Sequence, residues 1–280
     1  MSSPALKQVP PRPFLKWAGG KNRLIPQYQP YFPKSFNTYY EPFLGGGAVF
    51  FHLQPQSAVL TDINPELINA YCCVRDNVEE LIERLQEHQQ KHSNDYYYER
   101  RKLTPDTEIE RAARFIYLNR TCFNGLYREN SQGEFNVPIG RYKNPQICNP
   151  ELLRSASATL RMRNVKIEKK SFEYVLDFAN SSDDFVYFDP PYYPVSSTSN
   201  FTAYSRDFFS KNDQTKLGEI FVELAGRGVK VMLSNSDYDF IRDLYSQFKI
   251  HKISAARFIN SNGKKRGNVS EILVASRDCC

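Results

Sequence analysis

Short hydrophobic runs recur near both ends of the chain, separated by stretches with helical spacing. The runs are rich in β-branched and aromatic residues and predict buried strands at Thr38–Tyr40, Ala58–Thr61, Val165–Ile167, Phe185–Phe188, Val229–Leu233 and Ser270–Ala275. Helices are expected at Asn22–Tyr31 and at Asn64–Tyr71, where Pro65 suits a first helical turn. Strands that alternate with helices predict an α/β fold, a mostly parallel sheet with helices on both faces.

The middle of the chain interrupts this alternation. From about Val74 to Tyr117 the pattern is helical, in the stretches ELIERLQEHQQ, YYYERRKL and RAARFIYL. Asn124–Tyr142 is rich in glycine, asparagine and other polar residues with β-prone pieces between them, which indicates a hairpin. We therefore expect one domain formed by residues 1–70 and 152–280, with residues 71–151 inserted as a second, helical and hairpin-containing domain.

Charge and cysteine content narrow the class of protein. The 280 residues carry a formal net charge of +6, with basic residues in excess between Arg111 and Lys143 and clustered again at Lys264, Lys265 and Arg266. This suits a polyanionic partner, although a few basic surface loops would look the same. The six cysteines include no C-x-x-C pair, and no run is long enough to span a membrane. We expect a reduced, cytoplasmic protein with no metal site and no membrane partner.

A glycine-rich turn follows the first expected strand. The segment E-P-F-L-G-G-G, Glu41–Gly47, stands between a strand and a helix, and glycines such as Gly45 let a backbone turn tightly against a ligand. Asp62 ends the next strand, where a carboxylate accepts hydrogen bonds from ribose hydroxyls. The turn is also compatible with a purely structural role, and Asp62 with an N-cap of the following helix. Without a phosphate-binding lysine motif, the pair favours a nucleoside over a nucleoside triphosphate.

A second candidate site follows the strand Phe185–Phe188. Asp189, Pro190, Pro191 and Tyr192 make a stiff loop at its carboxyl end, where open α/β sheets bind ligands. An exocyclic amine is a poor nucleophile because its lone pair is conjugated with the ring. Asp189 and the Pro190 carbonyl can each accept one N–H and so point the lone pair outward, while Tyr192 offers a face for an extruded base. The alternative is a turn that only stops the sheet.

Together these motifs resemble the Dam-type DNA adenine-N6 methyltransferases, the D12 class with the alpha order of motifs. The resemblance runs from Phe14 to about Ala275, and its markers are FLKWAGGK, EPFLGGG, TDIN, LNRTCFNGLYRENSQGEFNVPIGRY, FDPPY, NFTAY and ISAARFINSNGKKRGNVSEIL. It implies a Rossmann-like methyltransferase sheet and transfer of a methyl group from S-adenosylmethionine (SAM) to adenine N6. The catalytic domain would be residues 1–70 and 152–280, and residues 71–151 would recognise the target.

The resemblance also implies individual roles. The positions that match the SAM site are Trp17, Lys21, Phe43, Gly45, Asp62, Ser171, Phe172 and Asp189. From the residues alone, Trp17 could equally be a core anchor and Lys21 a solvated charge. The positions that match DNA contacts are Lys16, Phe123, Asn124, Leu126, Arg128, Pro138 and Tyr142, with Lys264, Lys265 and Arg266 as phosphate contacts.

The chemistry of the DNA positions is consistent with a GATC site. Arg128 can bind guanine O6 and N7, Leu126 and Pro138 suit a thymine methyl, and Phe123 can fill the stack left by a flipped base. A palindromic site lets a monomer treat each strand in turn. Two alternatives stay open at this point. One is methylation of RNA or of a protein glutamine by the same loop. The other is a catalytically idle DNA-binding relative, against which the presence of both Asp62 and Asp189 argues.

Overall fold

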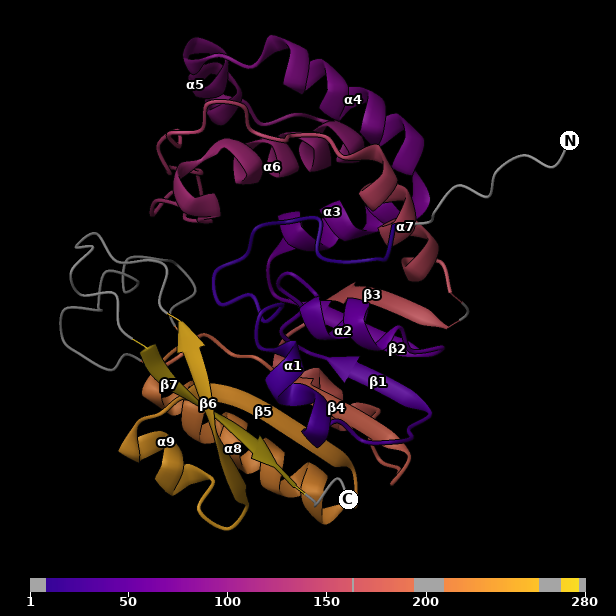
Figure 1. The fold of residues 1–280 in the computed structure, drawn as a ribbon, viewed down its shortest axis with the longest axis vertical. Helices are drawn as coiled ribbons and strands as arrows, with labels where there is room; N and C mark the ends of the chain where they lie inside the picture. Colours follow the sequence, from indigo (N-terminus) through magenta and orange to yellow (C-terminus); the bar gives the residue numbers. More distant parts are fainter. Residues whose placement is uncertain (1–8, 163, 194–208, 257–267, 277–280) are drawn as a thin grey trace, which may run out of the picture.

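Helices and strands alternate around one sheet, with a group of helices inserted after the second strand (Figure 1). The computed structural model describes residues 9–162, 164–193, 209–256 and 268–276. The strands are β1 (Thr38–Glu41), β2 (Ala58–Asp62), β3 (Val165–Lys169), β4 (Asp184–Phe188), β5 (Lys230–Ser236), β6 (Lys249–Ala256) and β7 (Asn268–Ala275). The α-helices are α1 (Ile25–Tyr28), α2 (Ala48–Leu53), α3 (Pro65–Asp76), α4 (Val78–Lys91), α5 (Asn94–Lys102), α6 (Glu108–Thr121), α7 (Pro150–Leu160), α8 (Lys211–Gly226) and α9 (Asp239–Leu244). Three 3-10 turns are η1 (Gln29–Tyr31), η2 (Phe123–Gly125) and η3 (Phe172–Asp177).

The sheet has seven strands in the order β3-β2-β1-β4-β5-β7-β6. The first five in this order pair in parallel, and β7 pairs antiparallel with both β5 and β6. The predicted α/β class is therefore confirmed. β6 was not predicted, because its residues KIHKISAA mix lysine and histidine with isolated apolar positions. As the last strand in the sheet, β6 pairs on one side only, and such a strand needs no continuous hydrophobic run.

Successive residues of the central strands feed two different cores. Tyr39, Phe185 and Tyr187 belong to a large cluster that extends through α1, α2 and the inserted helices. Tyr40 and Val186, one position away, belong to a second cluster formed with α8, α9 and η3. All five residues of β4 are buried, as expected of a parallel strand covered on both faces. This two-sided packing holds the carboxyl ends of the strands in fixed positions.

The inserted helices form a layer above the sheet, on the side away from α8 and α9 (Figure 1). Helix α6 packs on α3, α4 and α5, and α7 packs on α3 and α4. The expected boundaries at residues 71 and 151 lie inside α3 and α7, so the two parts share helices rather than a linker. Within the described residues, no helix has both the length and the apolar character to cross a membrane.

The segment expected to be a hairpin folds back on itself without regular strands. It turns at residues 130–133, where the Gly133 N–H donates to the Asn130 carbonyl at 3.0 Å and Gly133 has φ of 81°. Single antiparallel bridges join Cys122 to Ile139 and Glu129 to Phe135. Glycine, asparagine and proline between the β-prone residues disfavour a continuous ladder. Phe135 and Val137 of this segment are buried, whereas Arg128 and Pro138 are exposed.

Candidate active site

The chain reverses its direction of travel across the sheet between β1 and β4. From β1 it continues to β2 and β3 on one side, and it later returns to β4 and β5 on the other. A crevice forms outside the carboxyl ends of two such strands, and ligands of open α/β sheets bind there. The glycine turn follows β1 and Asp189 follows β4, so both predicted motifs lie at this crevice.

The turn after β1 depends on its glycines. Gly45 has φ of 46° and Gly47 has φ of 65°, both in the left-handed region. A Cβ atom on Gly45 would lie 2.7 Å from Trp17 Cδ1, and one on Gly47 would lie 2.7 Å from the Tyr71 hydroxyl. The Tyr71 hydroxyl itself donates to the Gly45 carbonyl at 3.1 Å. The glycines therefore serve the packing of the turn as well as any close approach by a ligand.

Asp62 supports the glycine turn and does not cap the next helix. Its Oδ2 accepts the Gly45 N–H at 3.1 Å, and its Oδ1 accepts the Asn64 N–H at 3.0 Å. The N-cap of α3 is Asn64, whose side chain accepts the N–H groups of Glu66 and Leu67. The N-cap interpretation of Asp62 is therefore wrong.

Aromatic rings lie beside this turn. Phe43 stacks on Phe172 with ring centroids 5.4 Å apart and an interplanar angle of 21°. Phe209, which was not predicted, meets both rings edge-on at 5.6 Å and 5.5 Å. Ser171 is exposed at the start of η3, and the backbone N–H of Lys170 donates to the Asp62 carbonyl at 3.2 Å. The predicted residues Phe43, Asp62, Ser171 and Phe172 are thus neighbours.

The segment before α1 brings two more predicted residues to the same place. Trp17 packs between the glycine turn and the insertion, with its ring stacked on Tyr127 at 6.0 Å. Lys21 is only 2% exposed, so its interpretation as a solvated charge is wrong. Its Nζ donates to the Gly19 carbonyl at 2.6 Å and pairs with Asp189 Oδ1 at 2.8 Å. A buried ammonium needs such partners, since an unpaired one would be strongly destabilising.

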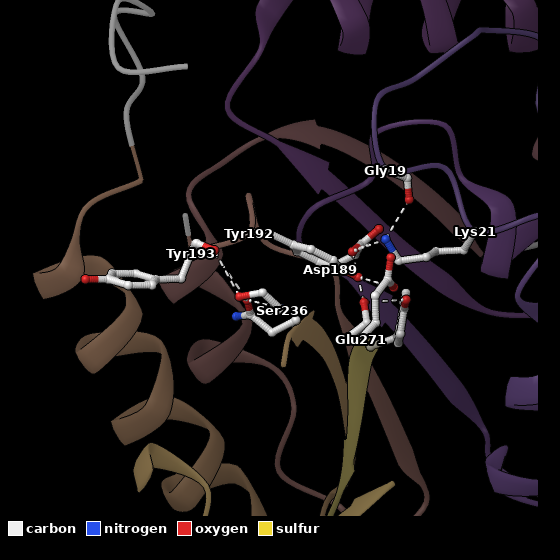
Figure 2. A network of polar contacts seen from close by, with 10 residues as sticks. Gly19, Lys21, Asp189, Tyr192, Tyr193, Ser236 and Glu271 are labelled. Carbon is white, nitrogen blue, oxygen red and sulfur yellow. Dashed lines mark hydrogen bonds and ion pairs between the residues drawn. The ribbon is translucent and has the colours of Figure 1, made fainter. Parts of the chain in front are cut away.

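Asp189 is held by a directed set of donors (Figure 2). Its Oδ1 accepts from Lys21 Nζ and from Ser234 Oγ at 2.9 Å, and Ser234 in turn lies 2.9 Å from the Tyr187 hydroxyl. Since Ser234 donates its only proton to Asp189, Tyr187 donates to Ser234. Burial and the nearby Asp189 raise the pKa of Tyr187 well above its usual value, so it stays a donor. Oδ2 of Asp189 makes no hydrogen bond or ion pair with the residues that the structure describes.

A second carboxylate reaches the loop from β7. The Tyr192 hydroxyl donates to Glu271 Oε2 at 2.7 Å, and the ammonium of Lys21 lies 4.6 Å from the Tyr192 ring centroid (Figure 2). Burial raises the pKa of Glu271, although the charge of Lys21 opposes this. The polypeptide around Tyr192 is fixed as well, because Gln214 donates to the Pro191 carbonyl at 2.9 Å and Ser236 to the Tyr193 carbonyl at 3.0 Å.

A third carboxyl group lies beneath the site, at the end of β1. Glu41 is 2% exposed and accepts a hydrogen bond from the Tyr39 hydroxyl at 2.9 Å. Burial raises the pKa of Glu41 to about 8, and the charges of Asp189 and Asp62 act in the same direction. The base of the crevice therefore holds a carboxyl group that keeps its proton at neutral pH.

The predicted DNA-contacting residues of the insertion lie on its surface. Phe123 is 47% exposed and Tyr142 is 37% exposed, both unusual for large hydrophobic side chains. Arg128 is exposed too, with its Nε donating to Asn136 Oδ1 at 2.6 Å. Lys16 Nζ lies 3.9 Å from the Tyr142 ring centroid and donates to the Arg120 carbonyl at 3.2 Å. Asn124 and Pro138 are exposed and Leu126 is half-buried, so the set forms one outward-facing group.

One buried asparagine joins this surface to the segment before α1. Asn119 Oδ1 accepts the Lys16 N–H at 2.8 Å, and its Nδ2 donates to the carbonyls of Lys16 at 2.6 Å and Gly125 at 3.3 Å. Asn119 is 2% exposed. The segment that carries Lys16 and Trp17 and the turn at Gly125 are therefore bonded to the same side chain.

Several residues that complete the site were not predicted. Ser234 and Glu271 lie on strands that were predicted from their hydrophobic residues. Their roles at the site follow only from their hydrogen bonds in the structure. Asn119 stands within the motif LNRTCFNGLY, which marks its segment but not its role. The predicted phosphate contacts Lys264, Lys265 and Arg266, and the motif NFTAY, lie outside the described residues.

Comparisons with known proteins agree with this geometry. The model of the family described as D12 class N6 adenine-specific DNA methyltransferase matches residues 17–259. The type II methyltransferase M1.LlaDCHI of Lactococcus lactis subsp. cremoris is 48% identical over 271 residues, 95% of this chain and 95% of the relative. The type II methyltransferase M.MjaIII of Methanocaldococcus jannaschii is 42% identical over 286 residues, covering 94% and 98%. The DNA adenine methylase of Escherichia coli K12 is 38% identical over 272 residues, covering 94% of each chain.

Proposed function

Because the chain belongs to the D12 class of N6 adenine-specific DNA methyltransferases, we propose that it methylates the adenine of GATC in double-stranded DNA, with SAM as the methyl donor. Adenine-specific DNA methylation follows from the family, so RNA and protein glutamine are no longer favoured as acceptors. The observation that carries the proposal is Asp189. One carboxylate oxygen is bound by Lys21 and Ser234, and the other makes no bond with the described residues at the crevice.

The residues of the crevice fit SAM. The positive φ of Gly45 and Gly47 brings bare backbone to the carboxyl end of β1, and Asp62, at the carboxyl end of β2, would bind the ribose hydroxyls. Phe43 and Phe172 form an apolar, stacked wall suited to a purine ring. These residues would hold the cofactor, with Trp17 and Ser171 completing the pocket. When bound, SAM supplies an activated methyl group on a sulfonium.

The chain's own residues then orient the target amine. Lys21 and Ser234 fix Asp189 through Oδ1, so that Oδ2 is presented to one N–H of adenine N6 without further reorganisation. The carbonyl of Pro190 accepts the second N–H. Both contacts draw the nitrogen towards a tetrahedral geometry and point its lone pair at the methyl group. Asp189 also carries the negative charge nearest the nitrogen as positive charge develops there.

Base extrusion makes this geometry accessible. An adenine inside a duplex cannot reach Asp189, so the enzyme has to flip it out of the stack. Tyr192 lies next to the catalytic loop and offers its ring to the extruded base. Phe123, exposed on the insertion, is placed to fill the gap that the base leaves in the duplex.

The side chains at the surface of the insertion support GATC as the target. Arg128 can bind a guanine through two hydrogen bonds, and Leu126 with Pro138 suits a thymine methyl. Lys16, beside Trp17, can reach the guanine that flanks the flipped adenine. Relatives include proteins named DNA adenine methylase as well as type II methyltransferases. We infer that residues 71–151 read the site while residues 1–70 and 152–280 bind SAM and catalyse transfer, as a monomer that treats each strand of the palindrome in turn.

A plasmid assay tests the specificity. DNA treated with the enzyme and SAM is digested with a nuclease that GATC methylation blocks, and the methylated adenines are mapped by sequencing. We expect full protection and methyl groups at GATC alone. Complete cleavage with N6-methyladenine in another sequence would refute GATC while leaving adenine methylation intact.

A further inference from the structure

Glu271 binds the hydroxyl of Tyr192, the tyrosine that follows the two prolines. It lies on β7, between β5 and β6, opposite Ser236 on one side and Ile253 on the other. Both pairings are backbone ladders, so the sheet fixes the backbone from which its side chain extends. From there Oε2 accepts the Tyr192 hydroxyl proton at 2.7 Å (Figure 2).

Tyr192 is thereby held at two points of its ring. The hydroxyl is tethered to Glu271, and one face of the ring is covered by the Lys21 ammonium at 4.6 Å from the centroid. Lys21 cannot drift from that face, because it is paired with Asp189 Oδ1 at 2.8 Å and is almost fully buried. A ring fixed by its tip and by one face has a defined plane, and the opposite face is the one that a base can approach.

A purely structural role would not require the energetic cost of the contact between Glu271 and Tyr192. A carboxyl group is placed in a half-buried site near Asp189, and burial opposes its charged form. An apolar side chain would pack in that position without this penalty. The group also makes no hydrogen bond to Asp189 itself, so the geometry does not make it a proton acceptor for the amine. Its carboxylate accepts the Tyr192 hydroxyl proton, and the buried Tyr28 hydroxyl also interacts with it.

We propose that Glu271 is a positioning residue for the target base, which holds the ring of Tyr192 in the plane on which the extruded adenine stacks. The inference rests on the proposed function. Base–aromatic stacking contributes about 1–3 kcal/mol per base, and a small misplacement of a reacting group lowers the rate by roughly a hundredfold. Loss of the tether should therefore affect the stacked base and the methylation rate, and not the binding of SAM.

The test compares Glu271→Ala, Glu271→Gln, Tyr192→Phe and the double variant Glu271→Ala/Tyr192→Phe in the full-length protein. Single-turnover methylation is measured at saturating SAM. Fluorescence is measured with 2-aminopurine replacing the target adenine, and SAM affinity by calorimetry. We expect Glu271→Ala and Tyr192→Phe each to slow transfer by about tenfold and to change the fluorescence in the same way. The double variant should lose no more than either single variant, since both changes break one contact.

Two variants separate positioning from folding. Glu271→Gln keeps an oxygen that accepts the hydroxyl proton and should stay within about threefold of wild type. Asp237→Ala removes another partly buried carboxylate, paired with Arg242, and should leave rate and fluorescence unchanged. Wild-type behaviour of Glu271→Ala, losses that add in the double variant, or a Glu271→Gln rate as low as that of Tyr192→Phe would overturn the inference. Failure of the wild-type enzyme to methylate adenine would instead refute the proposed function.

Discussion

Charged side chains in the crevice are held by specific partners, and their burial decides their roles. The sequence alone does not distinguish Lys21 from exposed lysines. In the structure its ammonium is buried and pairs with Asp189. Asp62 was expected either to bind ribose or to cap a helix, and Asn64 takes the cap. Periodicity indicates which side of a strand is buried. It does not indicate which polar atom reaches across from another strand, so Ser234 and Glu271 required the structure.

At Asp62 the account predicts a loss of cofactor affinity. Asp62→Ala removes the acceptor of the Gly45 N–H together with the proposed acceptor of ribose hydroxyls. Hydrogen bonds to a charged group contribute about 1.5–3 kcal/mol, so the Kd for SAM should rise roughly 10- to 100-fold. Calorimetry gives this value, and DNA affinity measured without SAM serves as the control. A SAM affinity equal to that of wild type would mean that Asp62 only shapes the turn.

Glu41 predicts a pH dependence of stability. The buried environment raises its pKa from the ordinary 4.5 to about 8, so the folded protein binds this proton more tightly than the unfolded chain does. The stabilisation is complete below about pH 4.5 and is lost as the pH rises through 8. Glu41→Gln keeps an acceptor for the Tyr39 hydroxyl but has no proton to release. The melting temperature of wild type should therefore fall relative to this variant between those pH values, and parallel curves would contradict the assignment.

At the scale of elements, the sequence predicted whether a segment is a helix or a strand better than where it ends or which strand it pairs with. Helix α3 continues to Asp76, past the expected end at Tyr71, because CCVRD carries on the helical pattern. β6 was not predicted because Lys249, Lys252 and His251 interrupt its hydrophobic run. Strand order depends on pairing between distant segments, which no local pattern contains. The link through Asn119 is of the same kind, since it joins Lys16 to a helix more than a hundred residues away.

Asn119 predicts a loss of stability larger than its size suggests. Asn119→Ala leaves the partly buried N–H and carbonyl of Lys16 without their partner, which costs about 1–3 kcal/mol for each unsatisfied group. Urea unfolding should show a lower midpoint with an unchanged slope. Asn69→Ala is the matched control, because it removes an exposed bond to the Glu108 carbonyl and a 3.7 Å acceptor contact for Cys73 Sγ, and it should cost under about 1 kcal/mol. Equal losses in the two variants would show that Asn119 does not join the two parts.

At the scale of the whole molecule, two surfaces meet at one crevice. The sheet brings the glycine turn and Asp189 to the same crevice, and the insertion carries exposed side chains such as Phe123 and Arg128. The family resemblance predicts that the first part catalyses transfer and the second recognises the target. How far the parts share helices α3 and α7 became clear only in the structure.

DNA-binding measurements should distinguish residues that recognise a base from residues that contact phosphates. Arg128→Ala removes the proposed guanine contact and should lose roughly 1–3 kcal/mol of discrimination at one base pair. Lys265→Ala, a proposed phosphate contact, should weaken binding to all sequences alike and reduce the slope of log K against log salt by about 1. Titrations of GATC duplexes and single-base variants over a range of salt concentrations measure both. A uniform loss in the Arg128 variant would assign that residue to the backbone.

The most direct test of the central claim is the single-turnover rate of N6-methyladenine formation by Asp189→Ala, followed by mass spectrometry of nucleosides at saturating SAM and DNA. Asp189→Asn, which keeps an oxygen near Lys21 and Ser234, controls for the loss of that pair, and thermal melting controls for folding. Loss of a preorganised contact to the reacting group typically lowers the rate by about a hundredfold or more. We predict such a fall in both variants, measured at saturating SAM so that any loss of cofactor affinity does not contribute. A folded variant that forms N6-methyladenine at nearly the wild-type rate would contradict the account.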